Sequence, residues 1–309
     1  MKFQVLMSSY NGAVFLREQL DSILSQTLLQ DKGWEIGITV RDDGSTDQTC
    51  EILREYSEKF SELSFYEGEN MGVIRSFFEL IRNVPDDVDV IALSDQDDVW
   101  MKDKLARAVS VMGQMDMEKP LLYCGMPLLT DEHLTPVSSI MYTDSVRPSF
   151  GNALVENICT GCTAVFNRSL AYMVKLETPA FTVMHDWWLY MLAAGFGQVA
   201  FDPEPHMYYR QHMDNTVGVK RNYRSEFLAR IRRFRKNRYN ISRQAASLQS
   251  ICEKHRLALS PDKAAWLLDV LDSKAHVSAR FRIVRNDKIY RQRKMDDFIF
   301  KIIFLTGTV

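Results

Sequence analysis

The stretch Val88-Asp89-Val90-Ile91-Ala92-Leu93, followed at once by Ser94-Asp95-Gln96-Asp97-Asp98, says most about this chain. Its first half is apolar and rich in β-branched residues, which predicts a buried strand whose end then carries three carboxylates. So much negative charge on one short turn is costly unless a cation or fixed donors offset it. The Asp-x-Asp spacing lets two carboxylates reach one divalent ion, Mg²⁺ or Mn²⁺. Because such an ion usually completes its shell with phosphate oxygens, the stretch predicts a diphosphate ligand.

A second interpretation of these aspartates needs no ion. Apolar residues recur at helical spacing from Leu105 to Met112, and Asp98 or Asp103 could cap that helix. Short acidic motifs often occur without a metal, so the stretch alone leaves both interpretations open.

Size and composition bound the class of protein. The 309 residues are 46% hydrophobic and carry a net charge of −2, which allows one large or two modest globular domains and gives no overall attraction to nucleic acid. The N-terminus lacks the pattern of a signal peptide, and no apolar run reaches the ~18 residues of a spanning helix, so a cytoplasmic protein is expected. The five scattered cysteines predict no disulfide framework, and Cys159 and Cys162 are interpreted as buried thiols near a glycine turn.

The first half of the chain alternates short apolar segments with amphipathic ones. Strands are expected at residues 5–7, 36–40 and 63–66, each followed by a helical pattern, which predicts an α/β fold with a doubly wound, mostly parallel sheet. Ligands of such sheets bind at the carboxyl ends of the strands. The turns at 8–12, 42–45 and 94–98 should therefore line one crevice. No Gly-x-Gly-x-x-Gly or Gly-Lys-Ser/Thr motif is present, which weighs against nicotinamide and P-loop domains.

The turn after the second strand has local signals of its own. Asp42 precedes a Gly-Ser turn and is interpreted as a cap of that turn. Ser45 and Gln48 have the spacing of a capping box for the next helix.

The second half of the chain is more mixed. Strands are expected at 121–124, 163–166 and 198–201, and beyond Lys220 the chain becomes helical and basic. The basic residues gather at 221–240 and 280–294. The final apolar segment, 298–305, is too short to cross a bilayer but could lie in its interface.

Several motifs in order resemble one enzyme family. These are Ser-Ser-Tyr-Asn-Gly at 8–12, Asp-Asp-Gly-Ser-Thr-Asp at 42–47, Ser-Asp-Gln-Asp-Asp-Val-Trp at 94–100, His-Asp-Trp-Trp at 185–188 and Tyr-Arg-Gln-His-Met-Asp-Asn-Thr at 209–216. The chain resembles the inverting glycosyltransferases of family two, and most of all the bacterial polysaccharide rhamnosyltransferases. The resemblance covers residues 1–218 and implies a GT-A fold, a Rossmann-like sheet flanked by helices. Residues 219–309 are then a basic helical extension.

The resemblance also implies roles for the first three turns. Ser9, Tyr10 and Asn11 look like part of a nucleotide pocket, and Asp43 looks like the acceptor for the N3 hydrogen of a uracil or thymine. Asp95 would meet the ribose or the metal. Arg75 could reach the phosphates or could be a solvated helix residue.

The remaining motifs supply the implied metal site and catalytic base. Asp97 looks like the principal ligand of Mg²⁺ or Mn²⁺, with Asp95 and His212 as further candidates. Asp186 matches the family's base, and burial beside Trp187 and Trp188 should raise its proton affinity. The two tryptophans, Arg210 and Gln211 are expected at the acceptor or in a closure loop.

The function that follows is transfer of L-rhamnose from dTDP-rhamnose to a lipid-linked cell-wall or capsular polysaccharide precursor, in one metal-dependent displacement that inverts the anomeric centre. The alternatives are a UDP-hexose or UDP-N-acetylhexosamine transferase of the same fold, or a non-catalytic nucleotide-sugar-binding scaffold. The basic C-terminal helices are expected to contact an anionic membrane surface or a second subunit as a homodimer, and not nucleic acid. The expected location is the inner face of the cell membrane.

Overall fold

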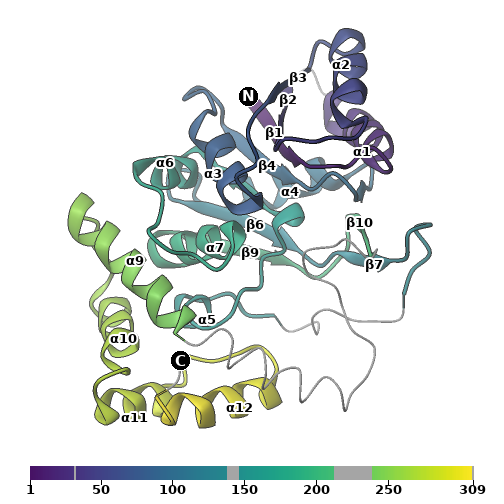
Figure 1. Ribbon diagram of the computed structural model, residues 1–309. Coiled ribbons are helices and arrows are strands. Elements are labelled where there is room, and N and C mark those ends of the chain that lie inside the picture. Colours follow the sequence, from purple (N-terminus) through teal and green to yellow (C-terminus); the bar gives the residue numbers. More distant parts are fainter. Residues whose placement is uncertain (31–32, 138–145, 212–238, 308–309) are drawn as a thin grey trace.

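The structure is a computed structural model that describes residues 1–30, 33–137, 146–211 and 239–307 (Figure 1). Its central sheet has seven strands in the order β3 (Leu63–Glu67), β2 (Glu35–Asp42), β1 (Lys2–Ser9), β4 (Val90–Ser94), β8 (Val165–Asn167), β6 (Leu121–Gly125) and β9 (Gln198–Asp202). The first four strands are parallel, β8 is antiparallel to both of its neighbours, and β6 pairs with β9 in parallel. The predicted α/β fold with a mostly parallel sheet is confirmed.

A smaller sheet continues from the acidic turn. It contains β5 (Val99–Trp100), β10 (Met207–Arg210) and β7 (Leu128–Thr130), in that order. Because β5 directly follows the turn and β10 pairs with it, this sheet fixes residues 95–98 from their C-terminal side.

Helices cover both faces of the large sheet. One face packs against α1 (Leu16–Leu24), α2 (Thr49–Lys59) and α4 (Lys104–Met112), with the short helix η1 (Thr27–Gln30) beside α4. The other face packs against α3 (Val73–Arg82), α6 (Arg168–Leu176) and α7 (His185–Phe196), with α5 (Phe150–Ala153) beside α7. Side chains of the strands alternate between these two layers: Val90 and Ala92 of β4 join one core, and Ile91 and Leu93 join the other.

Two local expectations from the sequence are wrong. Ser45 does not form a capping box with Gln48, because its hydroxyl donates to the Asp42 carboxylate and α2 begins without a side-chain cap. Neither aspartate caps α4 with its side chain. Asp103 stands at the N-cap position but makes no cap bond, and Asp98 accepts the backbone N–H of Arg210. The interpretation that needs no ion therefore has no support in this structure.

The C-terminal region is helical, as expected, with α9 (Asn240–His255), α10 (Pro261–Asp272), α11 (Val277–Arg285) and α12 (Lys294–Leu305). Its buried residues, such as Leu248, Ile283 and Phe300, belong to the same core cluster as α3, α6 and α7. The basic segment predicted at 221–240 lies almost entirely outside the described residues. Within the described residues, no helix is long and apolar enough to span a bilayer.

Gly151, in α5, marks where the C-terminal region packs on the helix layer that contains α7. A Cβ there would lie 2.0 Å from the carbonyl oxygen of Lys288, in the segment between α11 and α12. Gly151→Ala should therefore lower the free energy of unfolding by about 1–3 kcal/mol, because backbone must move. Denaturant titration measures the change.

The control is Gly113→Ala. Gly113 has a helical φ of −64°, and a Cβ there would lie 3.2 Å from the Val109 carbonyl oxygen, which a far smaller shift relieves than at Gly151, so the loss of stability should be much smaller. Equal stability of the two variants would contradict the close packing at Gly151.

Candidate active site

Three polar turns meet at the carboxyl edge of the parallel strands, as the sequence predicted. The register pairs Ser9 at the end of β1 with Asp42 at the end of β2, and it pairs Met7 with Ser94 at the end of β4. Side chains then join the turns directly. Gln96 accepts from the N–H of Tyr10 at 2.8 Å and donates to the Tyr10 carbonyl at 3.0 Å.

The first and second turns are joined in the same way. The backbone N–H of Asn11 donates to the Ser45 hydroxyl, and the Asn11 side-chain oxygen accepts from the N–H of Thr46, both at 2.8 Å. Asn11 has a φ of 47°, a left-handed conformation that asparagine tolerates better than most residues. Tyr10 is exposed, whereas Ser9 is buried and its hydroxyl donates to Asp42. The first turn therefore offers the exposed side chain of Tyr10 to a ligand, because its backbone N–H groups are already bonded to the other two turns.

Asp42 and Asp43 have different roles. Asp42 accepts from the N–H groups of Gly44 and Ser45, which confirms it as the cap of its own turn. Asp43 is almost fully buried and accepts from the N–H groups of Met71 and Gly72, both at 2.9 Å.

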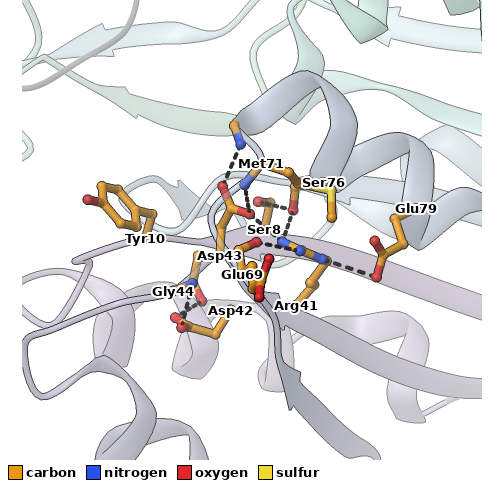
Figure 2. A network of polar contacts seen from close by, with 12 residues as sticks. Ser8, Tyr10, Arg41, Asp42, Asp43, Gly44, Glu69, Met71, Ser76 and Glu79 are labelled. Atoms are coloured by element: carbon orange, nitrogen blue, oxygen red, sulfur yellow. Dashed lines mark hydrogen bonds and ion pairs between the residues drawn. The ribbon is translucent and has the colours of Figure 1, made fainter.

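Arg41 holds Asp43 from below (Figure 2). Its guanidinium is 1% exposed, pairs with the Asp43 carboxylate and with Glu79, and donates to the carbonyl of Glu69. Sequence reasoning missed this residue, although a cation at the end of an otherwise apolar strand and beside two aspartates was a signal. Arg75, by contrast, is exposed on α3, and both predictions for it, a contact with the phosphates or a solvated helix residue, stay predictions.

The acidic turn concentrates negative charge in a buried place. Oxygens of Asp95 and Asp98 and the sulfur of Cys162 all lie within 4.8 Å of one another. Asp98 is fully buried and its Oδ2 has no hydrogen-bond partner. Burial and the charge of Asp97 raise the pKa of Asp95 to about 7 and raise the pKa of Asp98 well above its usual range.

This set of ligands fits a divalent cation. Two carboxylates converge on one place, one of them with an unsatisfied buried oxygen, and a hard ion such as Mg²⁺ or Mn²⁺ would offset their charge. Asp97 does not belong to this group of three, and its role as principal ligand stays a prediction. His212 lies outside the described residues. Cys162, which was expected to be only a buried thiol, lies against the acidic turn.

Arg210 holds the acidic turn in place through contacts of its side chain. Its guanidinium is buried, donates to the carbonyls of Asp97 and Glu132, and pairs with Glu18 at 2.5 Å. This placement differs from the predicted closure loop, because the donors of Arg210 are already engaged in holding the turn.

Gln211 directly follows the last residue of β10. Its backbone N–H donates to the carbonyl of Thr130 at 2.9 Å, which continues the pairing of β10 with β7. The backbone of Gln211 therefore extends the small sheet, and the expected contact of its side chain with an acceptor stays a prediction.

Asp186 stands in the first turn of α7 and faces the same site. The charge of Asp186 contributes to the raised pKa of Asp95, so the two carboxylates are close enough to interact. Asp186 is 7% exposed, and burial raises its pKa to about 7, in agreement with the expectation from its apolar surroundings. A carboxyl group with that pKa can accept a proton near neutral pH.

Two groups that the sequence did not reveal orient Asp186. The side-chain amide of Asn157 donates to its Oδ1 at 3.0 Å, and the backbone of Gly161 also hydrogen-bonds to it. Gly161 must be glycine for this approach, because a Cβ would lie 2.9 Å from Nε2 of the buried His185. Nothing in the spacing of Asn157 or Gly161 from Asp186 indicates the contact.

The two tryptophans differ in position. Trp188 is fully buried and belongs to the hydrophobic core, so its predicted contact with an acceptor is wrong for this structure. Trp187 is partly buried, and its indole N–H donates to the carbonyl of Ala153 at 2.7 Å.

Comparison with known proteins agrees with this geometry. The sequence matches Glycosyl transferase family 2 over residues 4–171, more than half of the chain. The chain belongs to this family. It is 28% identical over 238 residues to "dTDP-rhamnosyl transferase RfbG" of Shigella flexneri, an alignment that spans 72% of this chain and 76% of that protein.

Solved structures show the same fold. Residues 1–349 of TarS from S. aureus, in complex with UDP-GlcNAc, match with a TM-score of 0.59 and 17% identity, over 100% of this chain and 82% of that one. The mannosyltransferase PcManGT from Pyrobaculum calidifontis, in complex with GDP-Man and Mn²⁺, matches with a TM-score of 0.53 and 17% identity, over 99% of this chain and 85% of that one. The protein is a family-two glycosyltransferase with a GT-A fold.

The hydrogen bond from Asn157 predicts a pH effect. Because it stabilises the ionised form of Asp186, Asn157→Leu should raise the pKa of that carboxyl. The acid limb of the pH profile of kcat/KM, expected near pH 7 in the wild type, should then move to higher pH. Measuring glycosyl transfer between pH 5 and 9 locates the acid limb in the wild type and in the variant.

Asn83→Leu, at an exposed position after α3, serves as the control and should leave the acid limb in place. An unmoved limb in Asn157→Leu would contradict the assignment of that limb to Asp186.

Proposed function

We propose that this glycosyltransferase moves L-rhamnose from dTDP-rhamnose to a hydroxyl of a lipid-linked cell-wall or capsular polysaccharide precursor, with inversion at the anomeric carbon. The observation that carries the proposal is a buried carboxyl, Asp186, with a pKa of about 7 beside the charged turn at 95–98. The similarity to a protein named as a dTDP-rhamnosyl transferase supports the choice of donor.

Asp186 is the proposed base. It accepts the proton of the acceptor hydroxyl as that oxygen attacks the anomeric carbon and the bond to the nucleotide diphosphate breaks. Asn157 and Gly161 keep its carboxylate in place, and burial keeps water from competing for it. Because the attack comes from the face opposite the leaving group, one displacement inverts the anomeric centre.

Asp43 is the proposed acceptor for the N3 hydrogen of a thymine or uracil. Oδ1 accepts from the N–H of Met71 and from Arg41, whereas Oδ2 accepts one backbone N–H and has a second lone pair for the base. Arg41 pairs with this carboxylate and keeps it in place. Tyr10 and Asn11 border this pocket, and Asp95 is proposed to meet the ribose or the metal.

Asp95 and Asp98, with Asp97 and His212 as further candidates, are the residues proposed to hold Mg²⁺ or Mn²⁺. When bound, such an ion would neutralise charge on the departing diphosphate. The PcManGT complex, which contains Mn²⁺, supports a metal in this fold.

Transfer from a UDP-sugar is the second candidate. The TarS complex with UDP-GlcNAc favours it, since the folds correspond over the whole chain and a carboxylate accepts equally from uracil and thymine. A non-catalytic scaffold is disfavoured, because such a protein has no need of a buried carboxyl that is held by two donors.

Asp186→Asn tests both the base and the donor. The amide cannot accept a proton, so transfer should fall by about 10²-fold or more, while dTDP affinity measured by calorimetry stays within about twofold of the wild type. The substitution keeps the shape of the side chain. In parallel, the wild type should hydrolyse or transfer dTDP-rhamnose faster than UDP-glucose, UDP-GlcNAc or GDP-mannose.

Unchanged transfer by Asp186→Asn would reject the base. A preference for a UDP-sugar would reject the rhamnose donor but keep the mechanism, so the two parts of the proposal fail separately.

A further inference from the structure

The outward face of α12 is apolar. Met295, Phe298, Ile302 and Leu305 are 66%, 62%, 49% and 37% exposed, and they stand at positions i, i+3, i+7 and i+10, which share one side of a helix. Another side of the same helix buries Phe300 and Phe304 in the core. A surface helix normally turns polar residues outward, so this helix has one apolar face more than its packing requires. We refer to these four exposed residues as the outer face of α12.

The adjoining helix repeats the pattern. Val277 and Phe281 of α11 are 55% and 49% exposed and are one helical turn apart. Helices α11 and α12 contact each other and lie along the same edge of the molecule, away from the N-terminus (Figure 1). Exposed apolar side chains that gather on neighbouring helices mark an interaction surface more often than single ones do.

The same region is strongly basic. Residues 274–305 contain nine Lys and Arg against three Asp, a net charge of +6 in a chain whose total is −2. Arg285, Arg293 and Lys294 are exposed, and Lys294 begins the helix that carries the outer face. An anionic surface attracts each nearby cation by about 1 kcal/mol, so charge and apolar area favour the same kind of partner.

The outer face is connected to the catalytic base by a short path of contacts. Just before α12, Arg291 pairs with Glu156 at 3.3 Å, and the N–H of Gln292 donates to the same carboxylate at 2.6 Å. The residue after Glu156 is Asn157, which donates to Asp186. A partner bound at α12 is therefore held in a fixed relation to the base.

We propose that the outer face of α12 docks on an anionic lipid bilayer, with the helix lying in the interface and its basic flanks against the headgroups. With 12 residues the helix is too short to span a bilayer, and its apolar and basic groups suit an interfacial position. This deepens the proposed function, on which its purpose rests, because a docked enzyme meets a lipid-linked acceptor at the surface where that acceptor resides. It also narrows the expected membrane contact from the basic C-terminal region as a whole to one face of a defined helix.

Sedimentation of the full-length protein with vesicles tests the proposal without donor or acceptor. The wild type should bind vesicles of phosphatidylcholine with phosphatidylglycerol and bind pure phosphatidylcholine at least about tenfold more weakly. Phe298→Ser/Ile302→Ser should lose at least about tenfold in binding to the anionic vesicles, since two exposed apolar side chains no longer enter the interface. Arg293→Gln/Lys294→Gln should also bind more weakly and depend less on salt.

The matched control is Val14→Ser/Tyr172→Ser, which removes two apolar side chains far from α12 in the sequence that are more exposed than Phe298 and Ile302, at 81% and 64%. It should bind like the wild type. Circular dichroism and donor hydrolysis should be unchanged in the α12 double variants, which separates a failure of docking from a failure of folding or of the proposed glycosyl transfer.

Equal binding of Phe298→Ser/Ile302→Ser and the wild type would overturn the proposal, and so would equal binding to neutral and anionic vesicles. A wild type that fails to bind vesicles but sediments as a dimer in ultracentrifugation, with the α12 double variant a monomer, would assign the face to a second copy of the chain instead.

Discussion

The arrangement of this protein depends on carboxyl groups that are buried close together, one of which, Asp98, has an oxygen without a hydrogen-bond partner. The parallel register of β1 with β2 and β4 brings three strand ends to one edge of the sheet. Asp95 and Asp98 lie at this edge, and Asp186 of α7 is close enough to interact with Asp95. Burial makes ionisation of each of these groups costly, so the native state favours anything that supplies positive charge there. The same desolvation that makes the site costly raises the pKa of Asp186 to about 7, where a base works best.

The surrounding structure holds this charge in place. Gln96 and Asn11 join the three turns, Arg210 ties the backbone of the acidic turn to the rest of the sheet edge, and Arg41 fixes Asp43. On the other side, α9 fixes the segment that leads into α7, because the Gln244 side chain accepts from Thr182 and Val183. The C-terminal helices thus belong to the framework of the active site, and the contacts of Glu156 link them to the residue that orients the base.

Sequence reasoning reached the features that depend on local pattern. The buried strand before the acidic turn, the parallel βα units and the convergence of the turns follow from hydrophobic periodicity and from the topology of parallel sheets. It did not reach Asn157, Gly161 or the position of Cys162, because those contacts join segments far apart in the chain whose geometry no spacing encodes. It also misplaced Trp188, since a tryptophan next to a catalytic residue can face either the site or the core, and two successive helical residues point in different directions. Arg210 was misplaced for the same reason, because its contacts also join distant segments. Its motif predicted a closure loop, whereas its guanidinium donates to the acidic turn.

The central claim is that the acidic turn stores an uncompensated charge that a divalent cation relieves, and thermal unfolding at about pH 7.5 measures this directly. Mn²⁺ should raise the Tm of the wild type. Asp98 has a pKa above its unfolded value, so its burial lowers stability at every pH above that unfolded value, this one included. Asp98→Asn should therefore raise the Tm without metal and shrink the gain from Mn²⁺. An Asp98→Asn variant that is less stable than the wild type without metal, and that gains as much from Mn²⁺, would contradict the account.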